Sequence, residues 1–195
     1  MSTVIEPLKV HGALLIKPKV YVDERGYFYE THRTGVLSEA AGMDIIFTQG
    51  NESSSVAWTI RGLHYQNPRP QGKLMHCPEG SAWIVGVDLR ELSPSFGRNF
   101  VIQCSRENLH QVWLPPGLAA GFLAGPRGAI VSYACSGNTY DDDAGHVLKW
   151  SDGAHGVRWP IPEGIVPVVS AKDRSPQSTR TWEHCLKYSG TMEKP

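Results

Sequence analysis

Glycine and proline are spread along the whole chain, and they limit the length of any helix or strand that it can form. The 195 residues include 20 glycines and 14 prolines. The short apolar runs between them are rich in β-branched and aromatic residues, which favour strands. We expect strands at residues 13–16, 83–89, 100–104, 111–114 and 129–135. Frequent short strands predict an all-β sandwich or barrel. Helical periodicity is convincing only over residues 36–41, so we expect only short peripheral helices.

Length and charge narrow the class of protein. We expect residues 1–195 to form a single domain, with the polar tail from about residue 182 as an arm. The 19 basic and 19 acidic residues balance without any run of like charge, which argues against nucleic acid and membranes as partners. The 4 cysteines are scattered, as in proteins of a reducing cytosol. There is no signal-peptide pattern and no apolar run of roughly 20 residues, so we expect a cytoplasmic location.

A histidine followed closely by a lysine is the first candidate for chemistry. His64 lies in the segment Arg61–Gln66, nine residues before Lys73. A histidine with its usual pKa of about 6.5 is a good general base at neutral pH, although a lone histidine is more often structural. Such a base needs an acceptor on its other ring nitrogen, and Asp173 is our candidate. Lys73 would then stabilise an oxyanion such as an enolate, unless it is an ordinary surface lysine.

Tyr133 is the candidate for the opposing acid. In the expected strand 129–135, Tyr133 shares one face with Val131 and Cys135. That composition predicts that Tyr133 points to an interior, where its hydroxyl needs a polar partner. In a barrel this interior can be a ligand cavity, and the alternative is a core tyrosine. A base and an acid on opposite faces suit the inversion of a carbon next to a ketone.

Metal and cofactor chemistry have little support in the sequence. Metal-binding barrels often carry two histidines on one strand with a single residue between them, and neither His64 nor His76 has such a partner. No glycine-rich phosphate-binding motif follows an expected strand. We therefore predict neither a metal nor a cofactor.

Several ordered segments together resemble the family of nucleotide-sugar epimerases typified by dTDP-4-dehydrorhamnose 3,5-epimerase. The resemblance runs from about residue 7 to residue 175. It rests on segments 23–30, 49–53, 61–66, 71–74, 87–90, 93–97, 114–117, 149–152, 159–160 and 170–173.

This resemblance implies a cupin-type jelly-roll barrel, a double-stranded β-helix, without a metal. It also implies a homodimer to which an N-terminal strand contributes. The implied substrate is a nucleotide-diphosphate sugar with a ketone at C4 and no hydroxyl at C6, inverted at C3, C5 or both. His64 corresponds to the base and Asp173 to its partner. Lys73 corresponds to the enolate stabiliser and Tyr133 to the acid. Contacts to the substrate are implied for Arg25, Phe28, Glu30, Gln49, Asn51, Arg61, Tyr140 and Lys172.

Three departures from the family pattern leave the substrate open. Ala120 stands where a second active-site histidine is expected, Gly50 replaces an aspartate, and the segment from Tyr133 to Tyr140 is one residue longer than usual. The alternatives are a variant mono-epimerase, acting on a dideoxy-hexose or heptose nucleotide, and a binding protein that has lost catalysis.

Overall fold

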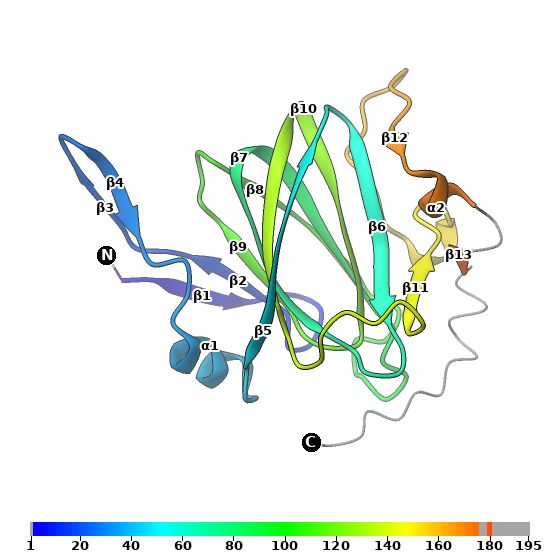
Figure 1. The fold of residues 1–195 in the computed structure, drawn as a ribbon, viewed down its shortest axis with the longest axis horizontal. Helices are drawn as coiled ribbons and strands as arrows, with labels where there is room; N and C mark the ends of the chain where they lie inside the picture. Colours follow the sequence, from blue (N-terminus) through cyan, green and yellow to red (C-terminus); the bar gives the residue numbers. More distant parts are fainter. Residues whose placement is uncertain (1, 176–178, 181–195) are drawn as a thin grey trace.

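The computed structural model describes residues 2–175, 179 and 180, and eleven of the strands form one twisted sheet (Figure 1). The main path runs β1-β2-β9-β7-β10-β6-β11-β13, with β5, β8 and β12 paired alongside it, and β3 and β4 form a separate hairpin. The strands are β1 (Val4–Pro7), β2 (Leu14–Lys17), β3 (Val20–Asp23), β4 (Gly26–Tyr29), β5 (Phe47–Ser55), β6 (Thr59–Gln66), β7 (Gly72–Asp88), β8 (Asn99–Ser105), β9 (Gln111–Leu114), β10 (Leu118–Ser136), β11 (Gly145–Leu148), β12 (Val168–Val169) and β13 (Thr179–Arg180). The helices are α1 (Thr34–Ala41) and α2 (Ala171–Arg174), with a 3-10 turn at Gly153–His155.

Two long strands, β7 and β10, change partners halfway and fold the sheet into two halves. The first half contains the first part of β7, the second part of β10, β9 and β5, and the second half contains the other parts of β7 and β10, β8 and β6. The first part of β7 pairs with β9, and its second part pairs with β8. In β10, residues 120–123 pair with β6, whereas residues 129–136 pair with β5. The register shifts between Ala124 and Ala129, where the two strands turn together. Gly80 lies at this corner with φ +71°, and a Cβ there would lie 2.3 Å from the Gly128 carbonyl oxygen, so a side chain is excluded.

The main core lies between the two halves. Met75 and Val131 come from one half, and Ile84 and Phe122 come from the other, and all four are buried in one cluster. The expected inward face of β10 is confirmed, because Val131 and Cys135 are buried in the interior on the same side as Tyr133. The outer face of the first half is covered by α1, whose Leu37 packs in a cluster with Trp113.

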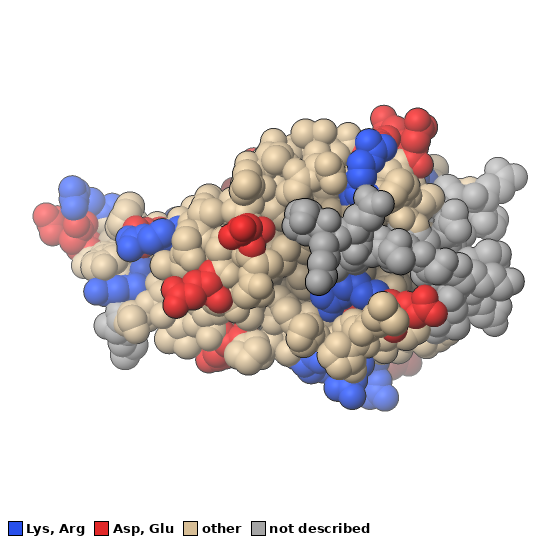
Figure 2. Space-filling model, turned by 90° about the horizontal axis from the view of Figure 1, so that it is seen from below, with Lys and Arg blue, Asp and Glu red and all other residues tan. Residues whose placement is uncertain are grey.

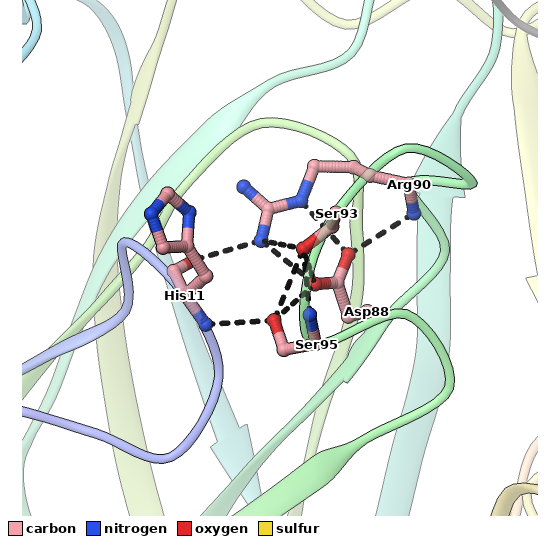
Figure 3. A network of polar contacts seen from close by, with 5 residues as sticks. All are labelled: His11, Asp88, Arg90, Ser93 and Ser95. Carbon is pink, nitrogen blue, oxygen red and sulfur yellow. Dashed lines mark hydrogen bonds and ion pairs between the residues drawn. The ribbon is translucent and has the colours of Figure 1, made fainter.

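A cluster of polar contacts holds the turn before β2 against the end of β7 (Figure 3). Asp88 is fully buried and accepts bonds from Arg90 Nε at 2.8 Å and from the hydroxyls of Ser93 and Ser95 at 2.6 Å each. Arg90 also donates to the His11 carbonyl at 2.7 Å, and the His11 amide donates to Ser95. A buried carboxylate with this many donors is a structural anchor.

The all-β expectation is confirmed, and four expected runs coincide with β2, β8, β9 and the second part of β10 within about one residue. The run at 83–89 is the second part of the longer β7, and the helix at 36–41 begins two residues earlier, at Thr34. The sequence did not predict β5, β6 or the β3–β4 hairpin. The tail from about residue 182 lies outside the described residues.

The β3–β4 hairpin projects from the barrel near the N-terminus (Figure 1). It exposes Tyr21, Val22 and Phe28 at 52%, 78% and 64%. On the face seen in Figure 2, basic and acidic side chains are interspersed rather than gathered by sign. Within the described residues, the helices are too short or too polar to cross a membrane.

Candidate active site

Two adjoining cavities open between the halves of the sheet, and they share His64, Lys73 and Tyr133. The larger holds about 300 Å³ and the smaller about 120 Å³. His64 comes from β6 in one half, whereas Lys73 on β7 and Tyr133 on β10 come from the other. The reactive groups therefore enter one space from opposing parts of the barrel.

His64 is held by a buried carboxylate. Its Nε2 lies 2.7 Å from Asp173 Oδ1, while the other carboxylate oxygen accepts the Gly62 backbone N–H at 3.2 Å. Asp173 is 3% exposed, whereas His64 is half-buried and lines both cavities. The bond to Asp173 fixes the ring and leaves Nδ1 as the nitrogen available for proton transfer.

A short helix presents Asp173 to the histidine. The Ser170 side chain caps α2 by accepting the Asp173 backbone N–H at 3.0 Å. Burial alone would raise the pKa of Asp173, but the hydrogen bonds from His64 and Gly62 outweigh burial and hold that pKa below its usual value. The carboxylate therefore stays charged at neutral pH and can stabilise a protonated His64.

Lys73 and Tyr133 lie across the cavity from His64, and burial shifts their pKa values in ways that suit proton transfer. It lowers the pKa of the Lys73 ammonium, which the nearby Cys135 opposes. It raises the pKa of the Tyr133 phenol, against a smaller effect of Arg61. Tyr133 is therefore protonated at neutral pH and able to donate, and Lys73 offers an N–H donor to a developing oxyanion.

Of the eight expected substrate contacts, five line the cavities. Gln49, Asn51, Tyr140 and Lys172 line the larger cavity, and Arg61 lines the smaller one. Gln49 donates to Asn51 Oδ1 at 2.9 Å and accepts the Tyr140 backbone N–H at 3.1 Å. The second of these bonds ties strand β5 to the loop that carries Tyr140.

The other three expected contacts lie outside the two cavities. Arg25 and Phe28 belong to the β3–β4 hairpin, and Glu30 follows it. Arg25 forms an exposed ion pair with Asp23 at 2.5 Å, and Glu30 forms one with Arg33 at 2.5 Å. Within one chain, the structure does not bring these three residues to His64.

Several lining residues were not predicted: Tyr65, Gln66, Gln71, Cys135 and His146. Tyr65, Gln66 and Gln71 lie within the segments that suggested the site, and Cys135 shares the inward face of Tyr133, so these four carried a signal. His146 contacts the Tyr65 ring at 5.3 Å between centroids and carried none. Among the described residues, no three His, Cys, Asp or Glu side chains converge as metal ligands.

Comparison with known proteins places this geometry in a family. Residues 7–180 match the family model described as dTDP-4-dehydrorhamnose 3,5-epimerase. The chain is 40% identical to the enzyme of that name from Methanothermobacter thermautotrophicus, over 84% of this chain and 88% of the relative. The chain belongs to this family. The expected carbohydrate epimerase, an isomerase, and the cupin-type jelly roll are thereby confirmed.

Two solved members of the family have nucleotide sugars bound. The enzyme from Legionella pneumophila, in complex with dTDP-4-keto-L-rhamnose, superposes with a TM-score of 0.82 at 35% identity. The match covers 88% of this chain and 89% of that one. A 3'-monoepimerase from Streptomyces bikiniensis, in complex with dTDP-quinovose, superposes with a TM-score of 0.82 at 30% identity. This match covers 93% of this chain and 89% of that one.

Proposed function

We propose that this epimerase acts on a dTDP-linked 4-keto-6-deoxy sugar and inverts C3, C5 or both. The observation that carries the proposal is the placement of His64 and Tyr133 on opposing halves of the barrel around a shared cavity. Inversion requires that a proton leave one face of a carbon and return to the other. The two nucleotide sugars bound by the related enzymes support the choice of substrate.

The first step removes the proton from a carbon next to the C4 ketone. His64 Nδ1 takes that proton, and Asp173, bonded to Nε2 at 2.7 Å, stabilises the resulting imidazolium. The electron pair of the broken C–H bond moves into the ring and places negative charge on the C4 oxygen. Lys73 donates a hydrogen bond to this enolate.

The second step returns a proton from the opposite face. Tyr133, which is protonated at neutral pH and whose pKa burial raises further, gives its phenolic proton to the same carbon as the ketone re-forms. His64 then loses its proton, and Tyr133 regains one from water. The reaction needs no oxidant, metal or cofactor, and the sugar leaves with the configuration at that carbon inverted.

The nucleotide half of the substrate fits the larger cavity. Gln49 and Asn51 offer amide groups, Tyr140 offers a ring against which a base can pack, and Lys172 offers a cation for the diphosphate. Arg61 offers a second cation at the smaller cavity. The half-exposed Tyr140 ring is available for such stacking.

We further propose that two copies of the chain complete each site as a homodimer. The exposed β3–β4 hairpin carries Arg25 and Phe28, and Glu30 follows it, so a partner could deliver all three to the cavity of the first copy. Exposed aromatic side chains on a projecting hairpin are typical of an interface. Strand β1 is an edge strand of the large sheet and would join the same contact. A cytosolic location is in keeping with the free thiols of Cys77, Cys104 and Cys135.

Deuterium incorporation tests the reaction. The protein is incubated in heavy water with dTDP-4-keto-6-deoxyglucose, and the product is examined by NMR. Deuterium at C3 and C5 is the result expected for double epimerisation, and deuterium at one carbon identifies a mono-epimerase. Tight binding without exchange at either carbon, across several nucleotide sugars, would instead identify a binding protein and refute the proposed reaction.

A further inference from the structure

The smaller cavity beside the reactive groups has walls of contrasting chemistry. It holds about 120 Å³, and His64, Lys73 and Tyr133 are part of its lining. Its remaining lining divides into two polar residues, Ser53 and Arg61, and four that present only apolar atoms or backbone, Met75, Ala120, Gly121 and Phe122. The cavity is too small for a nucleotide and adjoins the proposed base, so it suits part of the sugar.

Ala120 is the wall residue nearest to the base in the sheet. It pairs with His64 in the register between β10 and β6. It is 5% exposed and belongs to the same buried cluster as Met75 and Phe122. A methyl group, backed by further apolar side chains, therefore lines the cavity beside His64.

The other two polar lining residues, Arg61 and Ser53, already form hydrogen bonds within the protein. Arg61 Nε donates to Ser55 Oγ at 3.0 Å, and Nη2 donates to the Ser54 carbonyl at 3.1 Å. The Ser53 hydroxyl lies 3.5 Å from the Val131 carbonyl. A sugar hydroxyl directed at the Ala120 wall would lose its water and meet mainly carbon, which is unfavourable.

We propose that Ala120 sets the sugar specificity of this site in favour of a nucleotide-linked 4-keto sugar that lacks a hydroxyl at C2. This inference rests on the proposed function. The carbons next to the ketone are C3 and C5, whose outer carbon neighbours are C2 and C6. In a 6-deoxy sugar C6 is already a methyl group, so C2 is the neighbour where a hydroxyl or a hydrogen decides the fit. The substrate class is a 2,6-dideoxy-4-keto hexose.

Two substrates that differ only at C2 test the inference. They are dTDP-4-keto-6-deoxyglucose and its 2-deoxy counterpart, and kcat/KM is measured for each from deuterium incorporation in heavy water. We expect the wild-type protein to favour the 2-deoxy sugar by about 10- to 100-fold. Ala120→Ser supplies a partner for the hydroxyl and should bring the two values of kcat/KM close together.

Ala134→Ser is the matched control, because it makes the same change on the outward face of the same strand. Ala134 pairs with Leu74 and Gly50 and does not line either cavity, so the preference should stay at its wild-type value. Met75→Gln adds a polar group to the same chamber and should weaken the preference even if Ala120→Ser fails to fold.

The outcomes separate this inference from the function on which it rests. Exchange with both substrates at equal kcat/KM would overturn the role of Ala120 and leave the epimerase intact. The same holds for a preference that neither Ala120→Ser nor Met75→Gln changes. No exchange with either substrate would overturn the proposed function itself.

Discussion

At the scale of single residues, Lys73 carries a charge that the fold makes unfavourable. Burial lowers the pKa of its ammonium below the usual 10.5, so the charged form is destabilised in the folded chain relative to the unfolded one. At pH values below the pKa that Lys73 has in the folded chain, the free-energy cost of burying its charge is present in full. It disappears as pH rises from the folded pKa towards 10.5. A residue that costs stability and lines the reactive cavity is typical of function.

Replacing Lys73 by methionine should therefore raise stability and lower activity. We expect kcat to fall by about 10²- to 10³-fold, the usual loss for one oxyanion donor. The thermal midpoint at pH 7 should rise, and the gain should shrink as pH approaches 10. Circular dichroism melts across this pH range measure the effect, with the exposed Lys9→Met as a control that should leave stability unchanged. A lowered midpoint at pH 7 would contradict this account of Lys73.

Asp173 should act only through His64. Asp173→Asn keeps the shape of the side chain but removes the negative charge beside the imidazolium, and kcat should fall by about 10²-fold or more. In His64→Asn the kcat should fall further. The kcat of the double variant should be no lower than that of His64→Asn alone, because the two residues act as a unit. Losses that multiply in the double variant would show that the carboxylate works independently of the histidine.

At the scale of elements, the Asp88 cluster joins two segments that are far apart in sequence. Burial alone would raise the pKa of Asp88, but the bonds from Arg90, Ser93 and Ser95 prevail and hold it below the usual 3.8. A lowered carboxyl pKa contributes stability above pH 3.8, and this contribution is lost as pH falls from there through the folded pKa. The anchor is therefore intact at neutral pH.

Asp88→Asn should destabilise the fold without touching the cavities. Leaving the largely buried Arg90 without its carboxylate should cost about 3 kcal/mol in the free energy of unfolding. Urea denaturation at pH 7 measures the loss, and Glu107→Gln is the control, since its pair with Arg127 is exposed and its removal should change the free energy of unfolding little. A loss no larger than that of the control would mean that the cluster in Figure 3 is not an anchor.

How far the sequence predicts an element depends on what its side chains face. Strands β8 and β9 pack against the core, so their apolar residues mark them. Strand β5, with the sequence Phe-Thr-Gln-Gly-Asn-Glu-Ser-Ser-Ser, alternates in burial but not in polarity, because its inward residues line the cavity. A functional strand thus lacks the apolar alternation by which strands are recognised.

At the scale of the whole molecule, the proposed homodimer makes each site a joint product of two chains. A His64→Ala copy would keep an intact hairpin, and an Arg25→Ala, Phe28→Ala copy would keep an intact base. Each variant alone should be nearly inactive. When the two are unfolded and refolded together, half of the dimers pair them, and one site in each such dimer is intact. Activity should then recover to about a quarter of the wild-type value. No recovery in dimers shown to be mixed would contradict the shared site.

The site as a whole was predicted unevenly. Residue types and the family resemblance led to His64, Lys73, Tyr133 and Asp173, which the structure gathers around one space. His146 escaped notice, because no local pattern records that β11 lies beside β6. Nor could the sequence alone reveal that Ala120 and Met75 share a chamber, since 45 positions separate them along the chain.

Proton transfer from opposite faces is the central claim, and one variant tests it most directly. Tyr133→Phe keeps the base and the enolate stabiliser but removes the acid. In heavy water its substrate should take up deuterium through His64 and keep its configuration, while His64→Ala should take up none. If Tyr133→Phe instead yields epimerised product at the wild-type rate, the opposed base and acid are not the mechanism.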